Sequence, residues 1–159
     1  MLPLTTSNSG DERMKQKLSI SVRFAEPEDL DFCVELDYDH VSEAVLKRKI
    51  EERAVILAEV DGRTVGYLRV EYLWLKVPYL SVIRVNEEYQ RRGVGTAMIK
   101  FLEGHLRRHG HNVLYSSSQV NEPGPQMWHR KIGFKECGYL TGINEGGIGE
   151  VFFRKLLKK

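Results

Sequence analysis

The segment from Val85 to Thr96, with the sequence VNEEYQRRGVGT, joins an apolar, strand-like run to an amphipathic helix. Gly93 and Gly95 let the backbone of this segment approach a ligand closely and adopt φ values that a side chain disfavours. The helix that follows presents unpaired N–H groups at its N-terminus, where phosphate groups bind readily. Arg91 and Arg92 add cationic side chains that can pair with phosphate oxygens. The segment therefore predicts a pyrophosphate-binding turn between a strand and a helix.

Two other phosphate-binding turns are excluded by their spacing. The P-loop requires Gly-Lys followed by Ser or Thr, and this tripeptide occurs nowhere in the chain. The dinucleotide-binding pattern G-x-G-x-x-G would need a small residue at position 98, where the chain has Met98. The remaining pattern is Q-x-x-G-x-G, formed by Gln90, Gly93 and Gly95 before a helix. The simpler alternative is a glycine-rich turn with solvated arginines.

The Q-x-x-G-x-G pattern resembles motif A of the GCN5-related N-acetyltransferases (GNAT superfamily), whose members bind the pyrophosphate of acetyl-CoA at this turn. The resemblance implies acetyl-CoA as the cosubstrate. It also implies that the strand before the turn binds pantetheine through backbone groups, and that a later loop contains an asparagine. The cofactor-binding residues that it implies are Val85, Gln90, Arg91, Arg92, Gly93, Val94, Gly95, Thr96 and Asn121.

Alternation and helical periodicity predict elements in the order β-α-α-β-β-β-α-β-α-β-β. The expected strands are 19–24, 54–60, 64–72, 79–85, 112–115, 134–140 and 149–156, and the expected helices are 27–37, 42–53, 94–109 and 125–131. Asp61-Gly62 predicts a hairpin turn. This is the GNAT order, so the resemblance covers residues 19–157. It implies a single-domain α/β (α+β) fold: a mixed, mostly antiparallel sheet of about seven strands, flanked by four helices and splayed between the fourth and fifth strands.

Composition bounds the class of protein. The chain has 159 residues, 42% of them hydrophobic, which suits one globular domain over 18–159 after a disordered tail over 1–17. No apolar run approaches the roughly 20 residues that a membrane span needs. Cys33 and Cys137 form no CxxC pair and have no suitably spaced His, so we expect no metal and a cytoplasmic location.

The net charge of +2 conceals an uneven distribution. Residues 26–61 hold twelve acidic against four basic side chains, whereas residues 84–159 hold thirteen basic against seven acidic ones. One interpretation is two solvated faces. The other is a basic half for an anionic cofactor and an acidic half, with Asp37, Asp39 and Glu43, for a cationic acceptor.

A second part of the resemblance concerns the proton donor. GNAT members often carry Tyr-x-x-x-Gly-Phe, whose tyrosine protonates the departing thiolate; here the segment is HRKIGF, with His129 at the tyrosine position. Tyr115, at the end of the fifth expected strand, is a second candidate. The strand position at which many members carry a catalytic carboxylate is Ser81, which leaves Glu71 as the nearest candidate base or water anchor. The expected catalytic residues are therefore His129, Glu71 and Tyr115.

These features together predict an N-acetyltransferase that moves an acetyl group to a primary amine by direct transfer in a ternary complex. The acceptor is either a small molecule or a peptide amine. A non-catalytic acyl-CoA sensor is an alternative, because Ser81 and His129 depart from the family pattern. We expect no membrane partner and, since no recognised nucleic-acid-binding module is present, no nucleic acid. The resemblance also implies a homodimer formed through the C-terminal strands.

Overall fold

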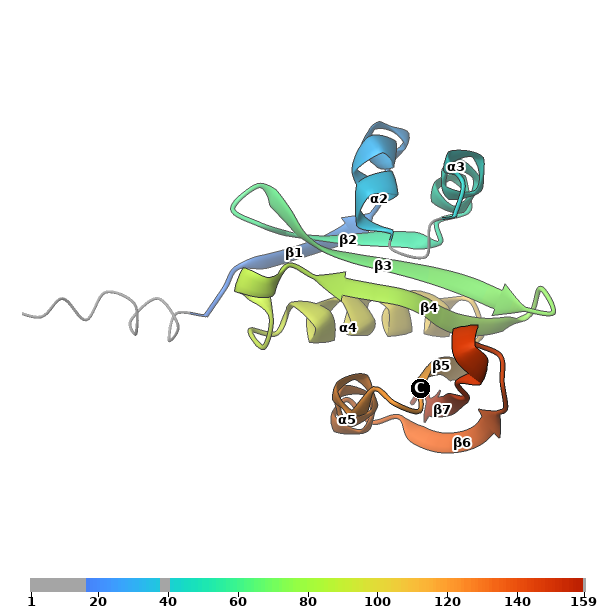
Figure 1. Cartoon of the computed structure of the whole chain (residues 1–159). Coiled ribbons are helices and arrows are strands. Elements are labelled where there is room, and N and C mark those ends of the chain that lie inside the picture. The colour runs from blue at the N-terminus through green and yellow to red at the C-terminus, as the bar shows by residue number, and fades with distance from the viewer. Residues whose placement is uncertain (1–16, 38–40, 159) are drawn as a thin grey trace, which may run out of the picture.

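The computed structural model describes residues 17–37 and 41–158. Its centre is a seven-stranded sheet in the order β1-β2-β3-β4-β5-β7-β6, with helices on both faces (Figure 1). The strands are β1 Ile20–Phe24, β2 Val55–Val60, β3 Arg63–Leu73, β4 Val77–Val85, β5 Val113–Gln119, β6 Lys135–Leu140 and β7 Glu150–Leu156. The α-helices are α2 Leu30–Leu36, α3 Glu43–Glu51, α4 Val94–Arg108 and α5 Pro123–Lys131. The GNAT-like fold class and the element order predicted from the sequence are confirmed.

Each face of the sheet carries its own apolar core. On one face, Cys33 of α2 and Leu46 and Ile50 of α3 pack against Leu57 and Tyr67 of the sheet. On the other face, α4 lays one apolar side over β1 to β4, as its sequence periodicity predicts. The residues that α4 buries are Val94, Met98, Ile99, Leu102, Glu103 and Leu106. Figure 1 shows α2 and α3 on one side of the sheet and α4 and α5 on the other.

Several element boundaries differ from the sequence prediction. The first expected helix is a short 3-10 turn, Pro27–Asp29, followed by α2. Strand β5 continues to Gln119, four residues past its predicted end, so the polar run from Ser116 is strand and not loop. Helix α5 begins at Pro123, two residues earlier than predicted. The expected tail, apart from Lys17, lies outside the described residues.

Two hairpins show how the turns are built. Asp61 and Gly62 both have positive φ, 50° and 74°, as the predicted Asp-Gly turn requires. The β3–β4 hairpin turns at Trp74 and Leu75, also with positive φ (50° and 62°), although neither residue type favours that conformation. Trp74 is 82% exposed at this turn.

The sheet divides where β4 meets β5. These two strands run parallel, and the register of the described residues joins them at two positions, Tyr79 with Tyr115 and Leu80 with Ser116. Beyond these pairs the strands diverge, which confirms the predicted splay. Just after the second pair, Ser81 is the extra residue of a β-bulge, since Arg69 and Val70 of β3 pair with Val82 and Leu80. The described residues include no helix long and apolar enough to cross a membrane.

Candidate active site

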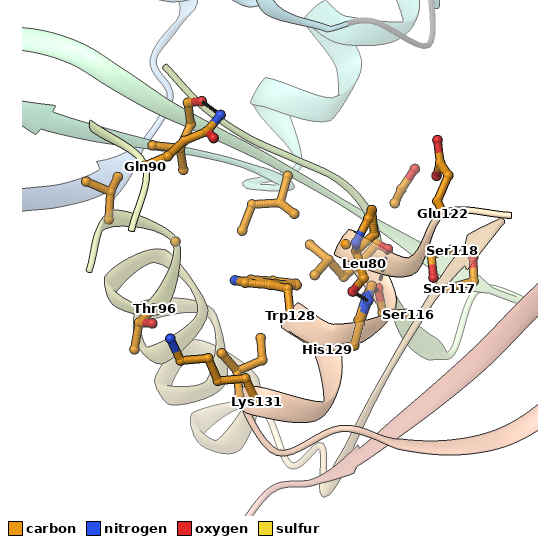
Figure 2. A pocket seen from close by; sticks show the side chains of 18 of the residues that line it. Leu80, Gln90, Thr96, Ser116, Ser117, Ser118, Glu122, Trp128, His129 and Lys131 are labelled. Carbon is orange, nitrogen blue, oxygen red and sulfur yellow. Dashed lines mark hydrogen bonds between the residues drawn. The ribbon is translucent and has the colours of Figure 1, made fainter. Parts of the chain in front are cut away.

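The splay between β4 and β5 opens into a cavity of about 930 Å³. Its walls come from β4, the turn before α4, the first residues of α4, the end of β5, α5 and the start of β7. Figure 2 shows Gln90 and Thr96 on one side of the cavity, Ser116 to Ser118 and Glu122 on the other, and Trp128 between them. The chain therefore brings the predicted pyrophosphate turn and the splayed strands into one site.

The turn before α4 is held in a compact conformation. Arg91 and Gly93 both have left-handed backbone, with φ of 58° and 90°. Gln90 donates a hydrogen bond from Nε2 to the Val85 carbonyl at 3.0 Å, which ties the turn to the end of β4. The positive φ predicted for both glycines holds for Gly93 alone, because Gly95 lies within the first turn of α4. A Cβ on Gly95 would lie 3.7 Å from Trp128, so its missing side chain leaves space on the cavity side.

Seven of the nine predicted cofactor-binding residues line this cavity: Val85, Gln90, Arg91, Gly93, Val94, Gly95 and Thr96. Arg92 and Asn121 do not line it. Arg92 instead lies over the ring of Tyr89, with its guanidinium carbon 5.9 Å from the ring centroid. Asn121 is in the exposed turn between β5 and α5, beside Glu122, which does line the cavity.

His129 projects from α5 into the cavity wall and is 4% exposed. Its ring stacks on Phe153 of β7, with the ring centroids 4.6 Å apart. Its Nδ1 lies 2.7 Å from the Pro125 carbonyl oxygen, and its Nε2 lies 2.7 Å from the hydroxyl of Ser116. Burial lowers the pKa of His129 below its ordinary value of 6.5, against the opposing effects of the Pro125 carbonyl and of Glu150. His129 is therefore predominantly neutral at pH 7.

The hydrogen bonds around His129 depend on its protonation state. A carbonyl oxygen can only accept, so Nδ1 carries a hydrogen and Nε2 of the neutral ring accepts the Ser116 hydroxyl proton. In the protonated ring, Nε2 donates to Ser116, whose hydroxyl then turns to the Leu80 carbonyl oxygen, 3.3 Å away. Ser116 can thus pass a proton between the cavity and His129.

The other predicted catalytic residues lie outside the cavity wall. Tyr115 pairs with Tyr79 in the sheet and is not a cavity-lining residue. Glu71 lies on β3, where it forms ion pairs with Arg69 and, at 2.6 Å, with Lys49 of α3. Its carboxylate is engaged by these two cations.

The expected acidic wall for the acceptor also differs. Asp37 is 3% exposed, and its Oδ2 accepts hydrogen bonds from Arg69 and the Tyr67 hydroxyl, each at 2.7 Å. It holds the end of α2 against the sheet and is not among the residues that line the cavity described above. Asp39 lies outside the described residues. The carboxylates that line the cavity are those of Glu122 and Glu150.

Several residues that line the cavity were not among the expected site residues, and Ser116, Ser118 and Glu150 are the most informative of them. Once β5 is extended to Gln119, alternation along the strand places Ser116 and Ser118 on one face and Ser117 on the other. Ser118 is 6% exposed, and its hydroxyl oxygen has no hydrogen-bond partner among the described residues. A buried hydroxyl without a partner at a cavity wall fits a polar ligand atom.

A family comparison agrees with this geometry. The acetyltransferase (GNAT) family model matches residues 20–134, which includes the turn, the splayed strands and α5. The chain therefore belongs to the GNAT family of acetyltransferases. Among the described residues, no group of three or more His, Cys, Asp or Glu side chains is arranged to hold a metal ion.

Individual relatives are distant. The chain is 29% identical over 101 residues to an N-alpha-acetyltransferase of Sulfurisphaera tokodaii, which covers 56% of this chain and 60% of that protein. The structure of Ard1 from Thermoplasma volcanium has a TM-score of 0.77 at 14% identity, covering 89% of this chain and 100% of that one. The structure of yncA from Salmonella typhimurium with its cofactor acetyl-CoA has a TM-score of 0.74 at 17% identity, covering 89% and 95%. The chain spans less than two thirds of the length of the curated relatives it matches, between 44% and 64%.

Proposed function

We propose that this protein is an acetyl-CoA-dependent N-acetyltransferase that moves an acetyl group directly to a primary amine in a ternary complex. The observation that carries the proposal is one cavity that joins the Gly93 turn, the splayed strands and the buried His129. Direct transfer is preferred to a covalent acetyl-enzyme, because neither Cys33 nor Cys137 lines this cavity. A cytoplasmic location is part of the same proposal.

The residues around the turn fit acetyl-CoA. The first N–H groups of α4, up to Thr96, precede the first intrahelical bond, which runs from Ala97 to the Gly93 carbonyl at 2.9 Å. These groups and Arg91 would hold the pyrophosphate. The diverging end of β4 would bind the pantetheine amides, and the Ser118 hydroxyl, which has no partner among the described residues, would bind a polar atom of the same arm. Bound acetyl-CoA supplies an acetyl group activated as a thioester.

His129 and Ser116 would move one proton in each transfer. The attacking nitrogen loses a proton as its bond to the acetyl carbon forms, and the sulfur gains one as the carbon–sulfur bond breaks. Since His129 is neutral at the start, it would accept the proton that leaves nitrogen in this step through Ser116 and pass it to the sulfur. The family tyrosine would be replaced by this pair of side chains.

Two kinds of acceptor remain candidates: a small-molecule amine and the amine of a peptide. The N-alpha-acetyltransferase name of the Sulfurisphaera tokodaii relative favours a peptide α-amine. A homodimer through the C-terminal strands also stays a prediction. It is compatible with β6, an edge strand whose residues are all exposed.

The test is an amine screen with acetyl-CoA, in which thiol release is measured and the acetylated product is identified by mass spectrometry. We expect thiol release that depends on both acetyl-CoA and a primary amine. Binding of acetyl-CoA without turnover across small amines and peptides would support the sensor alternative. If calorimetry detects no binding of acetyl-CoA to the wild-type protein, both the enzyme proposal and the sensor alternative are contradicted.

A further inference from the structure

The charged side chains of the cavity are divided between its two sides. Arg91 and Lys131 line the side formed by the turn before α4 and the end of α5, whereas Glu122 and Glu150 line the side formed by the β5–α5 turn and the start of β7. Figure 2 shows Lys131 and Thr96 on one side, and Glu122 and Ser117 on the opposite side. The positive charge of the first side complements an anionic cofactor. The second side is left to a ligand group of positive charge.

On that second side, the carboxylate of Glu150 is held in place by hydrogen bonds. Its Oε1 accepts a hydrogen bond from the Ser117 hydroxyl at 2.7 Å, and its Oε2 accepts one from Asn144 Nδ2 at 2.7 Å. Because Ser117 gives its only proton to Glu150, the Tyr79 hydroxyl, 2.5 Å from Ser117, is the donor in that contact. Tyr79, Ser117 and Asn144 come from β4, β5 and the β6–β7 connection. Three separate elements therefore fix the orientation of one carboxylate.

The Glu150 carboxylate can accept further hydrogen bonds from a ligand. A carboxylate has about four lone-pair sites, and the described donors occupy two of them at Glu150. Because Glu150 lines the cavity, a ligand in the cavity can bind to its remaining lone-pair sites. A primary ammonium group, which carries three hydrogen-bond donors and a positive charge, matches them.

Glu150 lies on the opposite face of the sheet from His129. Ser116 and Ser117 are consecutive in β5, so their side chains point to opposite faces; Ser116 contacts His129 and Ser117 contacts Glu150. Glu150 also pairs with Gln119 in the β5–β7 register, which places it on the Ser117 face. The splay between β4 and β5 joins the two faces through the cavity. An amine held at Glu150 would thus meet a thioester that enters from the α4–α5 side.

We propose that Glu150 binds the acceptor as a primary ammonium ion and takes its first proton, a role that rests on the proposed acetyltransferase function. The nitrogen–hydrogen bond breaks, its electron pair stays on nitrogen, and the proton moves to a carboxylate oxygen of Glu150 and then to solvent. The neutral amine then forms its bond to the acetyl carbon. The second proton of nitrogen follows the separate route through Ser116 and His129.

The proposal is tested with Glu150→Gln, which removes the charge and the base while keeping the size of the side chain. The probes are a peptide with a free α-amine and an N-acetylated peptide whose only amine is a lysine side chain. We expect kcat/KM for the lysine peptide to fall at least 100-fold. The loss should be smaller for the α-amine, whose pKa of about 8 lies below the lysine value of about 10.4, so less base is needed. Calorimetry should give an acetyl-CoA Kd within twofold of wild type.

The matched control is Glu145→Gln, the same change on an exposed residue of the β6–β7 connection that does not line the cavity. It should keep wild-type kcat/KM for both peptides. Circular dichroism and the thermal midpoint will show whether each variant is folded. Equal activity of Glu150→Gln and wild type would overturn the proposal, as would equal losses for both amines. A wild type that turns over neither peptide also counts against it, whereas a wild type that does not bind acetyl-CoA contradicts the proposed function instead.

Discussion

The ring of His129, the proposed proton relay, is held in one orientation by its packing. Its ring is stacked on Phe153, and both nitrogens have hydrogen-bond partners, so the ring has no freedom to turn away from Ser116. Replacing His129 with Ala should lower kcat by 10²- to 10⁴-fold, roughly the contribution of a general acid–base group. The acetyl-CoA Kd should stay within about threefold, because the proposed pyrophosphate site is elsewhere in the cavity.

Steady-state kinetics and calorimetry on the same preparation give both values for His129→Ala. Ser116→Ala is the companion variant, since it removes the route from the cavity to the ring without changing the ring itself. A comparable loss of kcat is expected for it. Full kcat in the folded His129→Ala variant would contradict the relay.

The pH dependence of kcat follows from the burial of His129. Burial favours the neutral ring and lowers its pKa, so the ring becomes protonated only at a pH below 6.5. A relay that starts from the neutral ring loses activity as the pH falls through that lowered pKa. We therefore expect an acidic limb of kcat, measured at saturating amine and acetyl-CoA, that lies below pH 6.5. A limb above pH 6.5 would assign the titration to another group.

Arg91 and Arg92 are neighbours with different surroundings, which makes them a natural pair of variants. Arg91 lines the cavity, whereas Arg92 lies over Tyr89 outside it. Arg91→Ala should weaken acetyl-CoA binding by about 1.5 kcal/mol, the lower end for a charge-assisted hydrogen bond, because the side chain is exposed. Arg92→Ala should have the smaller effect. Calorimetry with acetyl-CoA measures both, and the reverse order would contradict the assignment of the pyrophosphate to the Arg91 side.

At the level of elements, local patterns predicted most of the fold. The Asp61-Gly62 turn and the apolar side of α4 each depend on a few neighbouring residues, so the sequence reveals them. The polar run from Ser116 to Gln119 was not predicted as strand. The hydroxyls of Ser116 and Ser117 have their partners on α5 and β7, which are far along the chain. Tertiary contacts of this kind override local propensity.

Asp37 illustrates the same difficulty in the site prediction. Its position in an acidic segment suggested a solvent-facing carboxylate, whereas Arg69 and Tyr67, some thirty residues later, bury it. Charge patterns identify acidic residues, but they do not say which of them meet a buried cation. Glu150 was not predicted as a site residue, because nothing near it in the sequence indicates its partners. Its partners Ser117 and Asn144 come together only when β5 pairs with β7.

The buried ion pair between Asp37, at the end of α2, and Arg69 is expected to stabilise the folded protein. Asp37→Ala leaves the buried Arg69 guanidinium without one of its carboxylates and the Tyr67 hydroxyl without its acceptor. The free energy of unfolding should fall by about 3–5 kcal/mol, as for other buried ion pairs that lose one member. Urea denaturation measures the change. Glu43→Ala, at the exposed start of α3, is the control and should change the free energy by no more than about 0.5 kcal/mol.

For the whole molecule, acetyl-CoA should act as a stabilising ligand. A ligand at 100 times its Kd that binds only the folded state adds about 2.7 kcal/mol to the free energy of unfolding. For a chain of this length, that corresponds to a rise of about 5–10 °C in the thermal midpoint. Differential scanning calorimetry at several acetyl-CoA concentrations measures the rise. A midpoint independent of concentration would contradict binding to the folded state.

The two residue pairs that join β4 to β5 have a consequence for how the molecule holds together. In the described chain, β4 and β5 pair at these two positions, and beyond Ser81 their facing edges do not pair with each other. A pantetheine arm that bonds to those edges would complete the interrupted sheet in place of a missing strand. The cosubstrate would then be a structural component during each turnover, and product release would return the sheet to its divided form.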